Sequence, residues 1–163
     1  MFKQGSVRAV QLTLVLLGLC TMLSRAGAVS QEKKSESLYK RLGGYDAIAA
    51  VVDDFVPRLV NDPQLGKFFA GHGVDSKKRI RQLVVEQLCE ACGGPCFYIG
   101  RSMKAAHGGL GITESDWQAA VNHLVAVLTK FSVPQKEKDE LLAIATSLKP
   151  DIVSPPAVPA VNK

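Results

Sequence analysis

The feature that most constrains the fold of this chain is the spacing of its apolar residues, which recur every three or four positions. Between residues 45 and 60, the apolar positions are Ile48, Val51, Val52, Phe55, Val56 and Leu59. This spacing places apolar side chains along one face of an α-helix. Similar stretches follow at 75–92, 113–130 and 133–148, and none alternates with the period of two that is typical of a β-strand. The sequence therefore predicts an all-α fold.

The helix predicted after residue 74 carries the clearest stripe. Asp75 or Ser76 is expected to cap its N-terminus, because both side chains can accept a hydrogen bond from the first turn. The helix is expected to stop at Gly93-Gly94-Pro95. Its inner face is predicted to consist of Ile80, Leu83, Val84, Gln87, Leu88 and Ala91.

Residues 1–28 have the pattern of a secretory signal. Lys3 and Arg8 precede a largely apolar stretch, residues 9–23, and Ala26-Gly27-Ala28 provides the small residues that signal peptidases recognise. Cleavage near Ala28–Val29 would make the protein periplasmic or secreted. Polar residues interrupt the apolar stretch, so it is marginal as a membrane span. Membrane contact is expected only if this segment is retained as an uncleaved anchor.

The rest of the chain is expected to form one domain between two tails. A flexible leader at 29–37 precedes the domain at 38–149, and a disordered tail follows at 150–163, where Pro150 and three further prolines disfavour helix. Removing the signal takes away three positive charges and lowers the formal net charge from +5 to +2. The remainder offers no face of lysine and arginine interleaved with aromatic residues, so no nucleic-acid partner is predicted.

The chain has three histidines, and His107 has the most distinctive setting. It ends a short helical stretch that begins at Met103, directly before Gly108-Gly109. A histidine there can project its ring into a cavity, as an axial ligand of haem iron does. The same position also suits a cation near the negative end of a helix dipole. His72, in a Gly-His-Gly loop, and His123 are both expected to be exposed.

Several motifs occur together in a characteristic order. They are Leu38-Tyr39-x-x-Leu42-Gly43-Gly44, Phe68-Phe69, Gly93-Gly94-Pro95, Tyr98-x-Gly100-x-x-Met103-Lys104-x-x-His107 and Gly111-Ile112-Thr113. From residue 37 to 148 the chain resembles the group I truncated haemoglobins. The resemblance implies a two-over-two helical sandwich around haem b, with His107 as the proximal ligand of the iron. It also implies reversible binding of O2 or NO, an unidentified reductase as partner, and oxidation of NO to nitrate as a further activity.

The same resemblance implies which other side chains surround the haem. They are Phe55, Val56, Phe69, Ile80, Val84, Met103, Ile112 and Trp117. Many family members have a tyrosine after the phenylalanine of the first long helix and a glutamine in the following long helix, both of which hydrogen bond to the gas. Val56 and Val84 occupy these positions here and have no donor. Gln82 and Gln87 are the nearest alternatives, and the distal side is expected to be mainly apolar, with fast release of oxygen.

Cys89, Cys92 and Cys96 form a C-x-x-C-x-x-x-C motif around Gly93. A c-type haem site needs a histidine directly after the second cysteine, where Gly93 stands, and zinc needs a fourth ligand nearby. A disulfide suits an exported protein, and we predict it between Cys92 and Cys96, across the Gly-Gly-Pro turn. The competing hypothesis is a non-haem helical module that uses the three cysteines for thiol redox chemistry or partner binding.

Overall fold

The computed structural model describes residues 36–154; the predicted signal, nearly all of the leader and most of the tail lie outside this range. Its helices are α2 (Leu38–Arg41), α3 (Gly44–Asn61), the 3-10 helix η1 (Gly66–Phe69), α4 (Val74–Ala91), α5 (Met103–His107), α6 (Glu114–Lys130), α7 (Gln135–Ser147) and α8 (Lys149–Ile152). Within residues 36–154 there is no β-strand, as the sequence predicts. No helix of this range has the length and hydropathy required to cross a bilayer.

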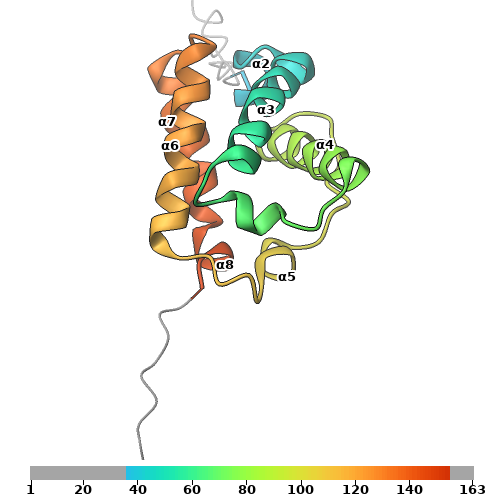
Figure 1. Ribbon diagram of the computed structural model, residues 1–163. Coiled ribbons are helices and arrows are strands. Elements are labelled where there is room, and N and C mark those ends of the chain that lie inside the picture. Colours follow the sequence, from blue (N-terminus) through green and yellow to red (C-terminus); the bar gives the residue numbers. More distant parts are fainter. Residues whose placement is uncertain (1–35, 155–163) are drawn as a thin grey trace, which may run out of the picture. The chain divides into compact units, whose positions relative to one another are not determined.

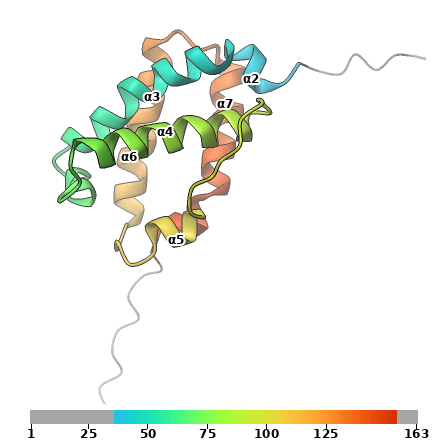
Figure 2. The ribbon, with the colours of Figure 1, turned by 90° about the vertical axis from the view of Figure 1, so that its right-hand side faces the viewer.

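The long helices pack as two pairs, which stand side by side in Figure 1; in Figure 2, α3 and α4 cross in front of α6 and α7. α3 packs against α4, and α6 lies beside α7, while further contacts between α3 and α6 join the two pairs. This arrangement is the two-over-two helical sandwich that the sequence motifs imply, so the predicted fold class is confirmed.

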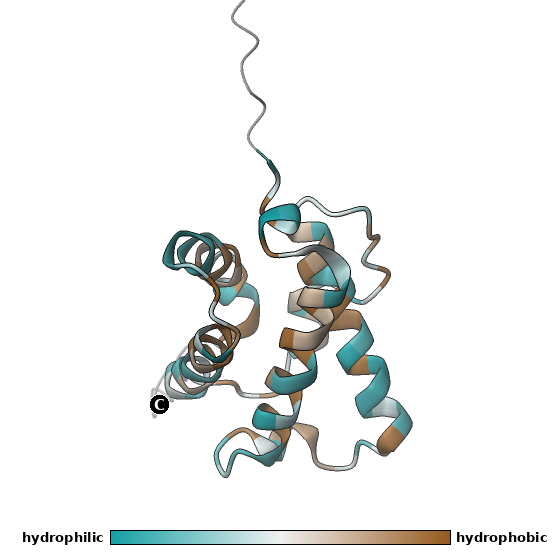
Figure 3. Cartoon of the chain, turned by 90° about the horizontal axis from the view of Figure 1, so that it is seen from above, coloured by the Kyte–Doolittle hydropathy of each residue, from teal (hydrophilic) through white to brown (hydrophobic). Residues whose placement is uncertain are grey.

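Two clusters of buried apolar side chains hold these pairs together, and Figure 3 shows brown, apolar faces along the long helices. The cluster between α3 and α4 consists of Ile48, Val52, Val56, Val85 and Cys89. The other cluster joins α3 to α6 and α7 and consists of Leu38, Val51, Cys92, Leu124, Val127, Leu128 and Leu141. The apolar stripes of the sequence therefore account for most of the core.

The start of α4 differs from the prediction. Its N-cap is Gly73, and the helix begins at Val74, so neither Asp75 nor Ser76 is the cap. Asp75 instead lies in the first turn, where its negative charge interacts favourably with the positive end of the helix dipole.

The predicted boundary between domain and tail is also wrong, because Pro150 lies inside a helical turn, α8. Proline is tolerated at the start of a helix, where a backbone N–H would have no helical partner. After α8, the N–H of Ser154 donates to the carbonyl of Ile112 at 2.8 Å. The ordered domain thus extends to residue 154.

Arg41 links the short α2 to α7. Its guanidinium group donates to Glu137 at 2.5 Å and also to Glu140. The hydrogen bond from Arg41 lowers the pKa of the Glu140 carboxyl below its usual value. These two contacts hold α2, at the start of the domain, against α7.

The start of α6 is fixed by a capping box between Thr113 and Asp116. The Asp116 carboxylate accepts hydrogen bonds from the backbone N–H and the hydroxyl of Thr113, at 2.9 and 2.7 Å. It also accepts a bond from the Gln64 amide at 2.9 Å and faces the Lys67 ammonium at 3.4 Å. Asp116 is only 2% exposed. The two bonds from Thr113, followed by the bond from Gln64, hold its pKa well below the usual value of 3.8.

We predict that Asp116→Asn lowers the free energy of unfolding at neutral pH by about 1–3 kcal/mol, because it removes the charge that these donors stabilise. A carboxyl whose pKa is depressed by folding contributes stability above its unfolded pKa and loses it as the pH falls through the folded value. The difference between wild type and Asp116→Asn should therefore be largest above about pH 5 and shrink as the pH falls below about 4. Urea unfolding across this pH range measures it. Asp46→Asn, in the first turn of α3 but exposed, is the control and should show little change.

Candidate functional site

A cavity of about 440 Å³ lies between η1 and α4 on one side and α5 and α6 on the other. In Figure 2, α4 and α5 bound this region from above and below. Its apolar lining consists of Leu59, Leu65, Phe68, Phe69, Ile80, Leu83, Val84, Tyr98, Met103, Ala106, Leu110, Ile112, Trp117, Ala120 and Ile152. Its polar lining residues are His72, Gln87, Arg101, His107 and Asp116. A largely apolar wall with a few polar groups is typical of a cofactor site.

His107 is oriented within this wall by its own helix. Its ring Nδ1 lies 2.9 Å from the carbonyl oxygen of Met103. A carbonyl can only accept a hydrogen bond, so Nδ1 carries the proton and the neutral ring has an unprotonated Nε2. A histidine that binds a metal through one nitrogen usually donates its other ring N–H in this way. His107 is therefore prepared to bind a metal through Nε2.

The short helix that carries His107 is capped at both ends. The Ser102 hydroxyl accepts the N–H of Ala105 at 3.2 Å, and Gly108 ends the helix. A Cβ atom on Gly108 would lie 2.8 Å from the carbonyl oxygen of Lys104, which makes glycine necessary there. These caps fix the last turn, and hence the position of the histidine ring.

Most of the residues predicted to surround the haem are brought together here. Those that line the cavity are Phe69, Ile80, Val84, Met103, His107, Ile112 and Trp117. They come from η1, α4, α5, α6 and the turn before α6, so distant parts of the sequence converge on one space.

Phe55 and Val56 are not among the lining residues, and their predicted place in the site is not what the structure shows. Phe55 packs against the cluster that joins α3 to α6 and α7. Val56 is buried between α3 and α4 and borders a separate hollow of about 630 Å³, together with Pro57 and Arg81. The reason is the rotation of α3, which presents Leu59 to the cavity instead.

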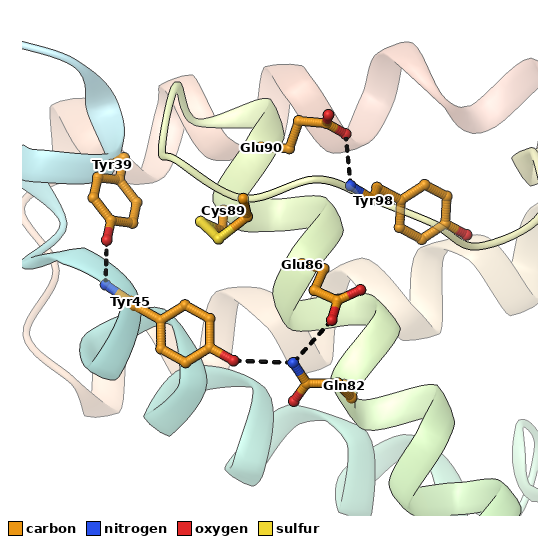
Figure 4. The surroundings of a disulfide bond; sticks show 8 residues. Tyr39, Tyr45, Gln82, Glu86, Cys89, Glu90 and Tyr98 are labelled. Atoms are coloured by element: carbon orange, nitrogen blue, oxygen red, sulfur yellow. Dashed lines mark hydrogen bonds between the residues drawn. A yellow bond between two sulfur atoms is a disulfide. The ribbon is translucent and has the colours of Figure 1, made fainter.

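The two glutamines considered as donors to a bound gas have different surroundings. The Gln82 amide donates to the Tyr45 hydroxyl at 3.0 Å and to the Glu86 carboxylate at 3.1 Å (Figure 4). These bonds hold it away from the cavity. Gln87 lies in the cavity wall, one helical turn beyond Val84, and is the glutamine that can reach a ligand there.

The other two histidines have different positions. His72 is exposed, as expected, but lies at the edge of the cavity. The prediction that His123 is exposed is wrong: it is half-buried, with its Nε2 2.8 Å from Asp62. The His123 bond, more than the backbone N–H bonds of Leu65 and Gln64, lowers the pKa of the Asp62 carboxyl. The pair fastens the turn between α3 and η1 to α6.

The predicted Cys92–Cys96 disulfide is wrong, because the bond joins Cys89 to Cys96. After α4 the chain reverses at Gly93, whose φ is +78°, and the N–H of Gly94 donates to the carbonyl of Cys89 at 2.8 Å. The following residues return along α4, so the sulfur of Cys96 reaches that of Cys89. Figure 4 shows the disulfide at the labelled Cys89.

Cys92 remains a thiol and is buried in the core. Burial raises its pKa to about 11, so it is protonated at neutral pH and a poor nucleophile. Nor do three or more histidine, cysteine or acidic side chains gather as a metal site anywhere in residues 36–154. The disulfide and the buried, protonated Cys92 weigh against the competing hypothesis of a module that uses the three cysteines for thiol redox chemistry.

Tyr98 and Arg101 also line the cavity, although the sequence analysis gave them no part in the site. The Tyr98 N–H donates to the Glu90 carboxylate at 3.3 Å (Figure 4). The Tyr98 hydroxyl donates to the carbonyl of Arg101 at 2.7 Å. The only sequence signal for them was their place in the motif before Met103. Leu59, also missed, was visible as the last member of the α3 stripe.

Comparisons with known proteins agree with this geometry. Residues 37–154 match the family described as bacterial-like globin. The group 1 truncated haemoglobin GlbN of Mycolicibacterium paratuberculosis is 36% identical over 72% of this chain and 85% of its own length. The GlbN of Synechocystis is 34% identical over 67% of this chain and 89% of its own.

Solved structures show the same fold. The Fe(III) form of truncated haemoglobin from Tetrahymena pyriformis has a TM-score of 0.68 at 23% identity, covering 74% of this chain and all of that one. The 2/2 haemoglobin of Synechococcus, in the cyanomet state with covalently attached haem, has a TM-score of 0.66 at 28% identity, covering 72% of this chain and 98% of that one.

The residues present fit the prosthetic group that such proteins hold. A porphyrin requires a large apolar enclosure, and its iron requires one unprotonated imidazole nitrogen. The cavity supplies the first, and the Nδ1–Met103 hydrogen bond of His107 supplies the second. This chain therefore belongs to the bacterial-like globins, with the group 1 truncated haemoglobins among its relatives and haem b as its cofactor.

Proposed function

We propose that this protein reversibly binds a diatomic gas, O2 or NO, at haem b held in the cavity by His107. The observation that carries the proposal is the hydrogen bond from the His107 Nδ1–H to the Met103 carbonyl, which leaves Nε2 unprotonated toward a metal. When bound, haem would supply a ferrous iron to which the gas binds reversibly.

The residues that line the cavity have different roles in the proposed function. His107 would bind the iron, and the hydrogen bond to the Met103 carbonyl fixes the orientation and tautomer of its ring. Phe69 and Trp117 provide aromatic surface for the porphyrin and exclude water. Gln87 has the amide that can donate a hydrogen bond to the gas.

Replacing the predicted iron ligand tests the proposal. We predict that His107→Ala abolishes stable haem retention, or leaves haem that is retained only with added imidazole. The Soret absorbance of the purified protein measures retention. His72→Ala, at the edge of the same cavity, is the control and should retain a wild-type ferrous spectrum. A wild-type spectrum in His107→Ala would contradict the assignment of the ligand.

The substitution Gln87→Leu tests whether the Gln87 amide donates a hydrogen bond to the bound gas. If the Gln87 amide donates to the gas, the variant should release oxygen roughly 2- to 10-fold faster, the equivalent of one neutral hydrogen bond. Stopped-flow oxygen dissociation measures the rate. Gln82→Leu is the matched control, because its amide is bonded to Tyr45 and Glu86, and should not change the rate. Equal rates in Gln87→Leu and wild type would mean that the site has no such donor at this position.

Oxidation of NO to nitrate stays a prediction from the sequence resemblance. One NO, one O2 and one electron give one nitrate, so continued turnover requires an electron donor. The unidentified reductase would be that partner. Reversible binding requires only the cavity and His107, and is therefore the function that we propose.

We also propose that the chain is exported and cleaved near Ala28–Val29. Disulfides persist in oxidising compartments, so the Cys89–Cys96 bond supports this location. Intact mass of the protein isolated from the periplasm or medium, alkylated unreduced under denaturing conditions, tests both points. We expect a chain that begins near Val29 with one alkylated cysteine, Cys92. A mass that retains residues 1–28, or three alkylated cysteines in the cleaved chain, would contradict the proposal.

A further inference from the structure

The loop between α4 and α5 exposes two large apolar side chains beside the cavity. Phe97 and Ile99 are each 79% exposed. Tyr98, between them, is half-buried and lines the cavity. This alternation is what an extended segment produces, because successive side chains point to opposite sides. Phe97 and Ile99 therefore share the outer side of the loop.

The loop is held in this conformation by several contacts. The disulfide fixes Cys96 to α4, and the N–H and hydroxyl of Tyr98 bond to Glu90 and to the carbonyl of Arg101. At Gly100, a Cβ atom would lie 2.3 Å from the Tyr98 ring, so only glycine fits beside that ring. The chain thus fixes a backbone that keeps two apolar side chains in water, an arrangement that marks an interaction surface.

Two of the charged side chains next to the loop are cations. Arg101 and Lys104 are both exposed and follow the loop directly. The Glu90 carboxylate, which accepts the Tyr98 N–H, keeps its negative charge, so the two cations outnumber the one acidic group that is bonded to the loop. Apolar side chains flanked by cations suit a surface that is apolar inside and anionic outside.

The start of the domain lies at the same edge. The N–H of Tyr39 donates to the carbonyl of Cys92 at 2.8 Å, and a Cβ atom on Gly93 would lie 3.3 Å from the Cβ of Ser37. The described part of the chain therefore begins beside the turn that opens this loop.

We propose that the loop Cys96–Gly100 is a membrane-docking loop, which places Phe97 and Ile99 into the surface of an anionic phospholipid bilayer while Arg101 and Lys104 face the headgroups. This role goes beyond gas binding and does not depend on it. Docking brings the cavity wall at Tyr98 and Arg101 close to the lipid surface.

Co-sedimentation with vesicles tests the proposal. The haem-loaded full chain and its Val29–Lys163 form are mixed with vesicles of phosphatidylethanolamine and phosphatidylglycerol, or of phosphatidylcholine alone. The shorter form contains all of residues 37–154, which match the bacterial-like globin family. It should bind the anionic vesicles, and Phe97→Ser with Ile99→Ser should weaken binding roughly tenfold or more. Lys104→Gln should weaken it roughly fivefold on anionic vesicles only.

Val74→Ser is the matched control, because Val74 is 70% exposed but lies at the start of α4, away from the loop. It should bind as wild type does. Soret absorbance and thermal unfolding establish that each variant is folded and haem-loaded. Absence of vesicle binding by the Val29–Lys163 form, or equal binding by the double variant, would overturn the proposal. A dimer seen by sedimentation velocity and abolished by the double variant would overturn it in favour of a second copy of the chain. Vesicle binding by a protein that fails to bind gas would leave this inference standing and refute only the proposed function.

Discussion

An apolar cavity of about 440 Å³ must stay open between two pairs of helices, and much of this structure follows from that requirement. Protein interiors are normally close-packed, and helices with apolar faces tend to close any gap between them. Here polar contacts fasten the elements at the margins of the cavity. Asp62 and Gln64, in the turn between α3 and η1, hydrogen bond to His123 and Asp116 of α6. Lys149 of α8 hydrogen bonds to Glu114 at the start of α6. These links set the separation of the elements without filling the space.

The helical period predicted which residues share a face but not which neighbour each face meets. On α4, Ile80, Val84 and Gln87 were predicted to be inside, and they line the cavity. The residues that pack against α3 are Val85 and Cys89, on the adjacent side of the helix. For α3 the same ambiguity led to an error, because Phe55 and Val56 belong to the core while Leu59 reaches the site. A stripe on one helix carries no information on the rotation of its partner.

Two further errors had the same origin in contacts between distant residues. The disulfide could not be predicted from spacing, because it depends on how the chain returns along α4 after Gly93. His123 was predicted to be exposed because it faces away from the apolar stripe of its own helix, the stripe that contains Trp117. Its position is decided by Asp62, which lies on a different helix end. His107 drew attention through its local setting, a short helix that ends at a glycine, but its assignment as the iron ligand came from the resemblance to the truncated haemoglobins.

The burial of Cys92 bears on how the chain acquires its disulfide. In an oxidising compartment the unfolded chain can form more than one pairing among Cys89, Cys92 and Cys96, and exchange among them requires a thiolate. Once the core closes over Cys92, its raised pKa keeps it protonated and its sulfur is inaccessible. The Cys92 thiolate, which would attack the disulfide, is therefore no longer available once the Cys89–Cys96 bond has formed and the core has packed. Burial of Cys92 in the apolar core thus prevents further disulfide exchange and preserves the Cys89–Cys96 bond once the domain has folded.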